Sequence, residues 1–236
     1  MTELVRDAEV RLGSGAMFDA IAARYDRVNR VLSMGLDGRW RRLTVEALAP
    51  VRPCRVLDVA TGTGDLALAA ARRFPEAEVI GLDPSAGMIA VGMGKLGPLA
   101  GRVRLEVGDA QGMPYGDGSF DAACMGFGIR NVPDRPLALR ELRRVLRPGG
   151  RLAILELSEP RRGVLAAIAR LWIRRGVPRV GAWLSGDREY RYLQESIAAF
   201  PPPEDFAATM GEAGFVEVRV RPLTFGVCCL YVGVAP

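Results

Sequence analysis

The chain contains no histidine among its 236 residues. This absence excludes a Ser-His-Asp triad, a Cys-His nucleophile pair, an HExxH metal site and a histidine general base. Any proton transfer must therefore use groups other than the side chain that most often serves near neutral pH.

Cysteine is also scarce, with neither CxxC spacing nor a histidine to complete a zinc set; the four are Cys54, Cys124, Cys228 and Cys229. This pattern is typical of small buried side chains in a reducing compartment, and it predicts no metal site. No stretch approaches the ~20 apolar residues of a membrane span. Residues 1–15 mix both charges, so we expect no signal peptide and predict a cytoplasmic protein.

The net charge of +5 is concentrated in one segment, because residues 161–179 hold six arginines and no acid. Its apolar residues recur at helical spacing: Val164, Leu165, Ile168, Leu171 and Trp172. Such a stripe either packs on its own domain or contacts an anionic membrane surface as a peripheral anchor. No nucleic-acid motif accompanies the charge, so we predict no nucleic-acid partner.

Strand-like and helix-like patterns alternate through the middle of the chain. The predicted strands are 54–61, 77–83, 103–109, 120–128 and 151–159; the predicted helices are 66–74, 135–150 and a short one that Ser85 caps. A helix over 204–213 and strands over 215–224 and 226–235 follow. Because the last link is so short, these strands must form an antiparallel hairpin. The sequence therefore predicts an α/β, Rossmann-like fold with a mostly parallel seven-stranded sheet, a C-terminal antiparallel hairpin and helices on both faces.

A glycine loop joins the first predicted strand to its helix. Gly62, Gly64 and Ala67 fit the spacing GxGxxA, which a structural turn would also use. Asp83 ends the second predicted strand, where a carboxylate can accept hydrogen bonds from ribose hydroxyls, and Asp109 ends the third, within reach of an adenine. The pattern indicates an adenosine-containing ligand.

Asp65 decides between two such ligands. It follows the loop at the amino terminus of the helix, where a carboxylate would repel the pyrophosphate of NAD and attract a positive ligand. We therefore favour S-adenosylmethionine, with Asp58 and Asp65 facing its methionine part. Helix capping is the alternative role for Asp65.

Several motifs resemble those of class I S-adenosylmethionine-dependent methyltransferases: VLDVATGTGD (56–65), GDAQGMPYGDGSFD (108–121) and RELRRVLRPGGRLAILELSEP (140–160). Residues 17–42, 126–134 and 190–206 are similar to the C-methyltransferases of ubiquinone and menaquinone biosynthesis. The resemblance implies methyl transfer to a ring carbon of a quinol, most simply demethylmenaquinol to menaquinol. Another phenolic or enolic acceptor stays open, and an NAD-dependent oxidoreductase is the less favoured class.

The resemblance also implies cofactor contacts at Thr63, Asp83 and the pair Asp109-Ala110. Some members use a serine where this chain has Gly126, so that contact is either lost or made by backbone. Members commonly carry a histidine in the last strand, and Tyr231 stands near its place, which leaves the exact acceptor open.

Arg130 and Asn131 follow the fourth predicted strand, at the sheet edge where α/β enzymes bind substrates. We expect Arg130 to stabilise a developing phenolate, since its guanidinium stays protonated. The alternative is a pair that braces the loop.

Two segments are expected to cover the acceptor within a single domain spanning 1–236: an N-terminal helical cap over 1–50 and a helical insertion over 160–202. Tyr25, Asn29 and Ser33 recur every four residues and share one helix face, with Tyr25 the best candidate for touching the acceptor ring. Tyr190, Tyr192 and Ser196 belong to the second segment, where core packing is the alternative. A homodimer is compatible with the sequence, but no residue pattern requires it.

Overall fold

A computed structural model describes residues 19, 22, 25–27, 29–31, 33–159 and 187–236. The basic segment 161–179, including its proposed membrane contact, lies outside these residues. So do the first 18 residues of the expected N-terminal cap and the first part of the expected insertion, residues 160–186. Among the described helices, none is long and apolar enough to cross a membrane.

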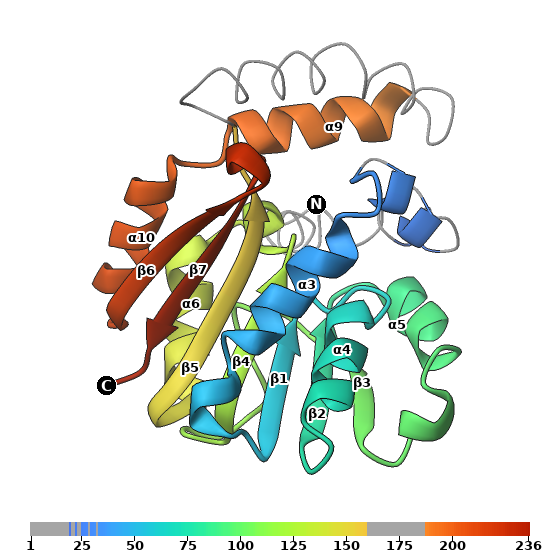
Figure 1. Cartoon of the computed structure of the whole chain (residues 1–236), viewed down its shortest axis with the longest axis vertical. Coiled ribbons are helices and arrows are strands. Elements are labelled where there is room, and N and C mark those ends of the chain that lie inside the picture. The colour runs from blue at the N-terminus through green and yellow to red at the C-terminus, as the bar shows by residue number, and fades with distance from the viewer. Residues whose placement is uncertain (1–18, 20–21, 23–24, 28, 32, 160–186) are drawn as a thin grey trace, which may run out of the picture.

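Seven strands form one sheet in the order β3-β2-β1-β4-β5-β7-β6 (Figure 1). They are β1 Arg55–Val59, β2 Glu78–Asp83, β3 Val103–Val107, β4 Phe120–Gly126, β5 Leu146–Leu157, β6 Val216–Leu223 and β7 Cys228–Val234. The first five run parallel, whereas β7 pairs antiparallel with both β5 and β6. The predicted sheet and its terminal hairpin are confirmed.

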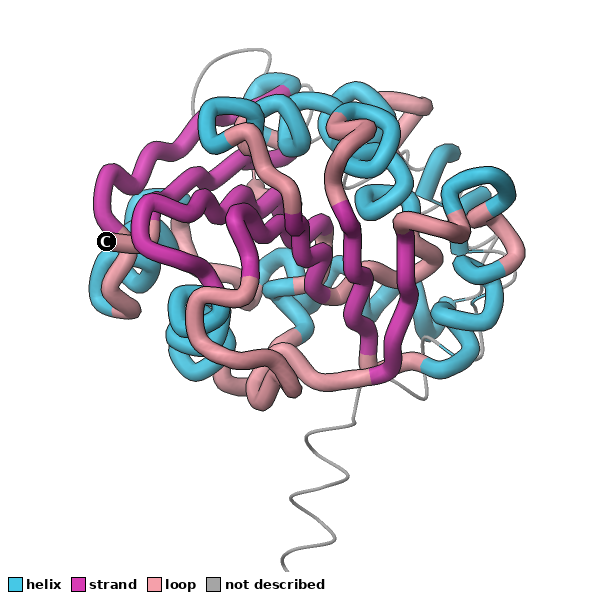
Figure 2. The backbone as a smooth tube through the Cα atoms, turned by 90° about the horizontal axis from the view of Figure 1, so that it is seen from below, coloured by secondary structure: helices cyan, strands magenta, loops and turns pink. Residues whose placement is uncertain are grey.

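The main helices are α3 Asp37–Glu46, α4 Asp65–Arg73, α5 Ala86–Met93, α6 Arg135–Val145, α9 Asp187–Ala198 and α10 Pro203–Glu212. They lie on both sides of the sheet (Figures 1 and 2). The helix predicted over 135–150 ends earlier, at Val145, because β5 begins at Leu146. Ser85 caps α5 as predicted, since its hydroxyl accepts the N–H of Met88 at 3.1 Å.

Two apolar cores lie between these layers, because strand side chains alternate between the faces of the sheet. Leu57 of β1 and Leu139 of α6 belong to one core, while Val56 of β1 and Ala70 of α4 belong to the other. Both faces are thus filled by side chains, so a ligand must bind at an edge. After β3 the chain returns to the far side of β1 to form β4, and this reversal opens a crevice at the carboxyl ends of β1 and β4.

Candidate active site

The glycine loop at the end of β1 leads directly into α4. Gly62 and Gly64 have φ of +56° and +79°, and Ala60 has +53°, so the strand predicted to reach residue 61 ends at Val59. Left-handed backbone favours glycine because a Cβ crowds the chain there. The loop brings the amino terminus of α4 to the crevice, where Asp65 and Leu66 line a cavity.

Asp83 lies across the crevice from this loop, at the end of β2. Its carboxylate accepts the N–H of Gly62 at 2.8 Å and that of Ser85 at 2.9 Å, one on each oxygen. Burial raises its pKa, and the two backbone hydrogen bonds oppose that rise. Each oxygen keeps a second lone pair, so two ribose hydroxyls can donate to the same carboxylate.

Asp109 and Ala110 line a first cavity within the crevice, and the wall of this cavity also includes Asp83 and Gly62. The Asp109 carboxylate accepts the backbone N–H of Gln111 at 2.9 Å, which holds the turn after β3. Ala110 is buried and gives the cavity an apolar patch. The structure therefore places this predicted pair beside Asp83, where a flat base has room.

Asp58 lies beneath the glycine loop and is fully buried. Burial raises its pKa to about 7, although hydrogen bonds from Thr61, from the backbone of Ala67 and from Cys124 act in the opposite direction. Its oxygens accept from the Thr61 hydroxyl at 2.5 Å and the Cys124 thiol at 3.7 Å. Asp58 thus supports the glycine loop from below. It also lines a second cavity, whose wall includes Thr61, Thr63 and Arg41.

Replacing Asp58 with asparagine is expected to flatten the pH dependence of stability. The pKa of Asp58 is about 7 in the folded protein, against an ordinary value of 3.8 for an exposed aspartate, so the folded protein holds this proton more tightly. The free energy of unfolding should therefore fall as pH rises through this window. Between about pH 5 and about pH 8, denaturant titrations should show wild type losing a few kcal/mol more than Asp58→Asn. Equal losses in the two proteins would contradict a buried, titrating Asp58.

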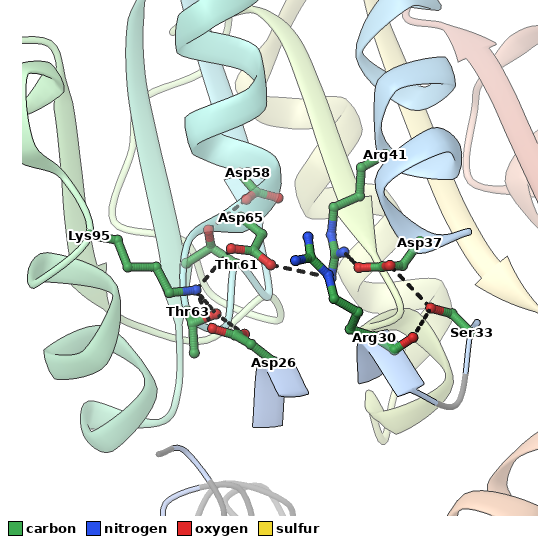
Figure 3. Close-up of polar contacts among 10 residues, drawn as sticks. All are labelled: Asp26, Arg30, Ser33, Asp37, Arg41, Asp58, Thr61, Thr63, Asp65 and Lys95. Carbon is green, nitrogen blue, oxygen red and sulfur yellow. Dashed lines mark hydrogen bonds and ion pairs between the residues drawn. The ribbon is translucent and has the colours of Figure 1, made fainter. Parts of the chain in front are cut away.

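Asp65, the first residue of α4, lines a cavity and also contacts two cations of the protein. The Lys95 ammonium approaches its Oδ1 to 2.8 Å, and the Arg41 guanidinium approaches its Oδ2 to 3.7 Å (Figure 3). The expectation that Asp65 faces the positive end of the ligand stays a prediction, and the carboxylate would share its charge with these two protein cations. The sequence pattern did not reveal these partners, which come from α3 and from the turn after α5.

Thr63 lines the same cavity as Asp65 and is also hydrogen-bonded to the N-terminal segment. Its hydroxyl donates to Oδ1 of Asp26 at 2.6 Å and accepts from Lys95 at 2.7 Å. A second carboxylate of the same segment, Asp19, accepts the N–H of Gly87 at 2.8 Å and the hydroxyl of Ser85. The segment is thereby attached at both the glycine loop and the start of α5.

The predicted polar face of the N-terminal segment is only partly realised. Tyr25 lines both cavities, whereas Asn29 and Ser33 line neither. Ser33 lies in a turn, and its hydroxyl donates to Oδ1 of Asp37 at 3.1 Å. The backbone N–H of Ser33 still donates to the carbonyl of Asn29 at 2.9 Å, and the positive φ of Met34 and Gly35 ends the helix directly after it.

Arg130 lies under the crevice, in the short turn Ile129–Asn131. Its guanidinium donates to Oε1 of Glu156 and to the carbonyl of Phe127, both at 2.7 Å, and Glu156 is completely buried. These contacts, and the absence of Arg130 from both described cavity walls, favour the alternative of a residue that braces the loop, and the expected contact with a developing phenolate stays a prediction. Asn131 does line the first cavity.

Helix α9 contacts this turn from outside the sheet, as Figure 1 shows. The hydroxyl of Tyr192 donates to Oδ1 of Asn131 at 3.0 Å, so α9 orients that side chain. Ser196 is buried and donates to the carbonyl of Leu193 within its own helix. The side chain of Tyr190 lies outside the described residues.

Phe127 is a site residue that the sequence pattern missed. It lines both cavities and adopts φ of +60°, which is uncommon for a bulky side chain and ends β4 two residues earlier than predicted. Gly126, beside it, also lines both cavities. The two cavities share this wall together with Tyr25 and Gly62, so they form one continuous crevice.

Comparison with known proteins shows the family to which the chain belongs. The ubiE/COQ5 methyltransferase family model matches residues 5–235. The chain is 47% identical to the demethylmenaquinone methyltransferase of Thermus thermophilus, over 93% of this chain and 100% of that protein. It is 46% identical to the ubiquinone/menaquinone biosynthesis C-methyltransferase UbiE of Syntrophotalea carbinolica, over 92% of both chains.

A solved structure of a methyltransferase shares the fold. A crystal structure of a SAM-dependent methyltransferase from Aquifex aeolicus superposes with a TM-score of 0.55 at 20% identity, covering 78% of this chain and 82% of that one. At such low identity the likeness concerns the fold alone, whereas the family match spans nearly the whole sequence. The chain therefore belongs to the ubiE/COQ5 methyltransferase family, and it is an S-adenosylmethionine-dependent C-methyltransferase.

Proposed function

We propose that the protein methylates a ring carbon of a prenylated quinol, with demethylmenaquinol as its preferred acceptor. The family and the names of its relatives support a quinone-related acceptor, and one of these relatives is a demethylmenaquinone methyltransferase. A demethylated ubiquinol precursor is the second candidate. The observation that carries the proposal is one crevice whose first cavity brings the predicted nucleoside contacts, Asp83 and the Asp109-Ala110 pair, together with Tyr25, Phe127 and Asn131.

The residues present fit the cofactor. Asp83 would accept the ribose hydroxyls, the Asp109-Ala110 pair would border the adenine, and Gly62 would admit the ligand close to the backbone. Gly64 and Thr63 would shape the loop around the methionine part, with Asp58 beneath it and Asp65 beside it. Gly126 would contribute its backbone where a side chain could block the crevice.

When bound, S-adenosylmethionine supplies a methyl group that the ring carbon attacks while the electron pair of the broken bond stays on sulfur. The protein must then hold the ring in line and favour loss of the proton from the adjacent ring hydroxyl. Tyr25 and Asn131 face the crevice and would hold the ring, with water as the proton acceptor. Orientation of this kind supplies ~7–11 kcal/mol when geometry is close to ideal.

Arg130 acts in this scheme as a positioning residue. Its backbone N–H donates to Glu156 at 3.2 Å and its side chain bridges Glu156 and Phe127, so it fixes the turn that carries Asn131. Tyr192 completes the arrangement by binding the Asn131 side chain from α9. The Asn131 amide is thus held from two directions.

An acceptor panel tests the proposal. Purified protein should methylate demethylmenaquinol at least about tenfold faster than a demethylated ubiquinol precursor, which corresponds to about 1.4 kcal/mol of discrimination. A non-prenylated phenol serves as the control. Equal rates for all three, or a preference for the phenol, would overturn the assignment of the acceptor.

Peripheral membrane contact through residues 161–179 is a finer part of the proposal, supported by the arginine-rich sequence alone. This contact can be tested by supplying the long-chain acceptor in anionic vesicles at low and at high salt. If the segment binds the membrane surface, the methylation rate should fall at high salt.

A further inference from the structure

Arg41 places a positive charge at the glycine-loop end of the crevice. It projects from α3 toward the start of α4, as Figure 3 shows, and its side chain is 13% exposed. One terminal nitrogen is paired with Asp37 of the same helix. The guanidinium also lies 5.8 Å from the centre of the Phe127 ring. The charge is thus held in a defined place rather than extended into solvent.

Arg41 lines the second cavity, so its position bears on how a ligand would bind there. Arg41 is the sole lysine or arginine among its described lining residues, which also include Gly62, Thr63 and Asp65. The nucleoside cradle at Asp83 belongs to the first cavity, which joins this one through Gly62. A ligand whose ribose binds Asp83 would therefore extend its other end past the loop toward Arg41.

The guanidinium retains hydrogen-bonding capacity toward that space. Its second terminal nitrogen approaches Asp65 only to 3.7 Å, which is too long for a hydrogen bond. Guanidinium groups bind carboxylates through parallel N–H donors, and a partly buried pair of this kind is stronger than a neutral hydrogen bond. Asp37 and Asp65 on either side orient the group without consuming all its donors.

Lys95 is less suited than Arg41 to binding a ligand carboxylate. Its ammonium is 2.7 Å from the Thr63 hydroxyl, 2.5 Å from Asp26 and 2.8 Å from Asp65, which uses the three donors that an ammonium has. It is also absent from both described cavity walls. Lys95 therefore joins the loop to the N-terminal segment, and Arg41 is left to face a ligand.

We propose that Arg41 binds the α-carboxylate of S-adenosylmethionine, with Asp37 and Asp65 as its positioning residues. The inference rests on the cofactor placement proposed above. The carboxylate is the one anionic group of this ligand, and Arg41 is the cation that the described cavity wall offers it. Arg41 thereby selects ligands that carry an intact amino-acid group over nucleosides that lack the carboxylate.

Calorimetry with two ligands tests this assignment without any turnover. S-adenosylmethionine and its decarboxylated form share the nucleoside, the sulfonium and the amine, and they differ in the carboxylate. Wild type should bind the intact ligand roughly 10- to 100-fold more tightly, the range expected for a hydrogen-bonded charge pair. Arg41→Gln should lose most of that factor for the intact ligand and change little for the decarboxylated one.

The matched control is Arg39→Gln, an exposed arginine on the same helix that should leave both affinities unchanged. Arg41→Lys should restore part of the preference, because it keeps the charge without the parallel donors. An equal loss for both ligands in a variant with unchanged melting temperature would make Arg41 a structural residue and overturn the proposal. Equal affinity of wild type for the two ligands would overturn it without any variant. Failure of wild type to bind either ligand would instead refute the cofactor placement.

Discussion

Replacing Asp83 with alanine is expected to weaken binding of S-adenosylhomocysteine by at least roughly 100-fold, because hydrogen bonds to a charged acceptor contribute ~1.5–3 kcal/mol each. The proposed cofactor placement gives this carboxylate two ribose hydroxyls. The substitution also removes the acceptor for the N–H groups of Gly62 and Ser85, so the glycine loop loses a support. Calorimetric titration of the folded variant measures the loss directly.

Asp117→Ala is the matched control, since its side chain is 82% exposed and its removal changes the net charge equally. It should bind the ligand as wild type does. The Asp83 variant must keep a cooperative thermal transition, which shows that the loop still folds. An unchanged affinity in such a protein would contradict the placement of the ribose at Asp83.

The backbone of the crevice could be predicted because local patterns determine it. Alternating apolar strands and helices specify a parallel sheet, and the carboxyl ends of parallel strands meet at one edge. Gly62, Asp83 and Asp109 each follow or end a strand, so their convergence in one cavity follows from topology. Asn131 and Gly126 reach the same cavity because β4 lies beside β1.

Ion pairs between side chains far apart in the sequence could not be predicted from such local patterns. Asp65 looked available for a cationic ligand, but its partners Lys95 and Arg41 lie 30 and 24 residues away along the chain. Neither spacing carries a recognisable period. The preference for S-adenosylmethionine over a pyrophosphate ligand is confirmed by the family match, whereas the contact of Asp65 with that ligand stays a prediction.

Glu156, by contrast, does leave a sign in the sequence. It is a single acid within the apolar strand β5, where an unpaired charge would be costly. The parallel register pairs Gly126 with Leu155, so Glu156 lies level with the segment that begins at Phe127. A buried acid in that register predicts a cation just after β4, and Arg130 is that cation.

Removing either member of the Arg130–Glu156 pair is expected to lower the free energy of unfolding by about 3–5 kcal/mol, because a buried charge is left uncompensated. Glu156→Leu should cost more than Arg130→Met. An arginine cannot lose its proton in a protein, so the guanidinium left by Glu156→Leu stays charged in its buried place. Denaturant titrations of the two variants measure both losses.

The double variant Arg130→Met/Glu156→Leu separates the pair from the chemistry. Replacing both charges by apolar groups of similar volume is often neutral, so most of the lost stability should return. Additive losses in the double variant would contradict the buried pairing seen at 2.7 Å. The double variant also helps to interpret turnover. A single Arg130 substitution removes the guanidinium that supports the turn carrying Asn131 and also leaves Glu156 without its partner. A loss of rate that persists in the restabilised double variant therefore reports the lost support of this turn rather than an uncompensated buried charge.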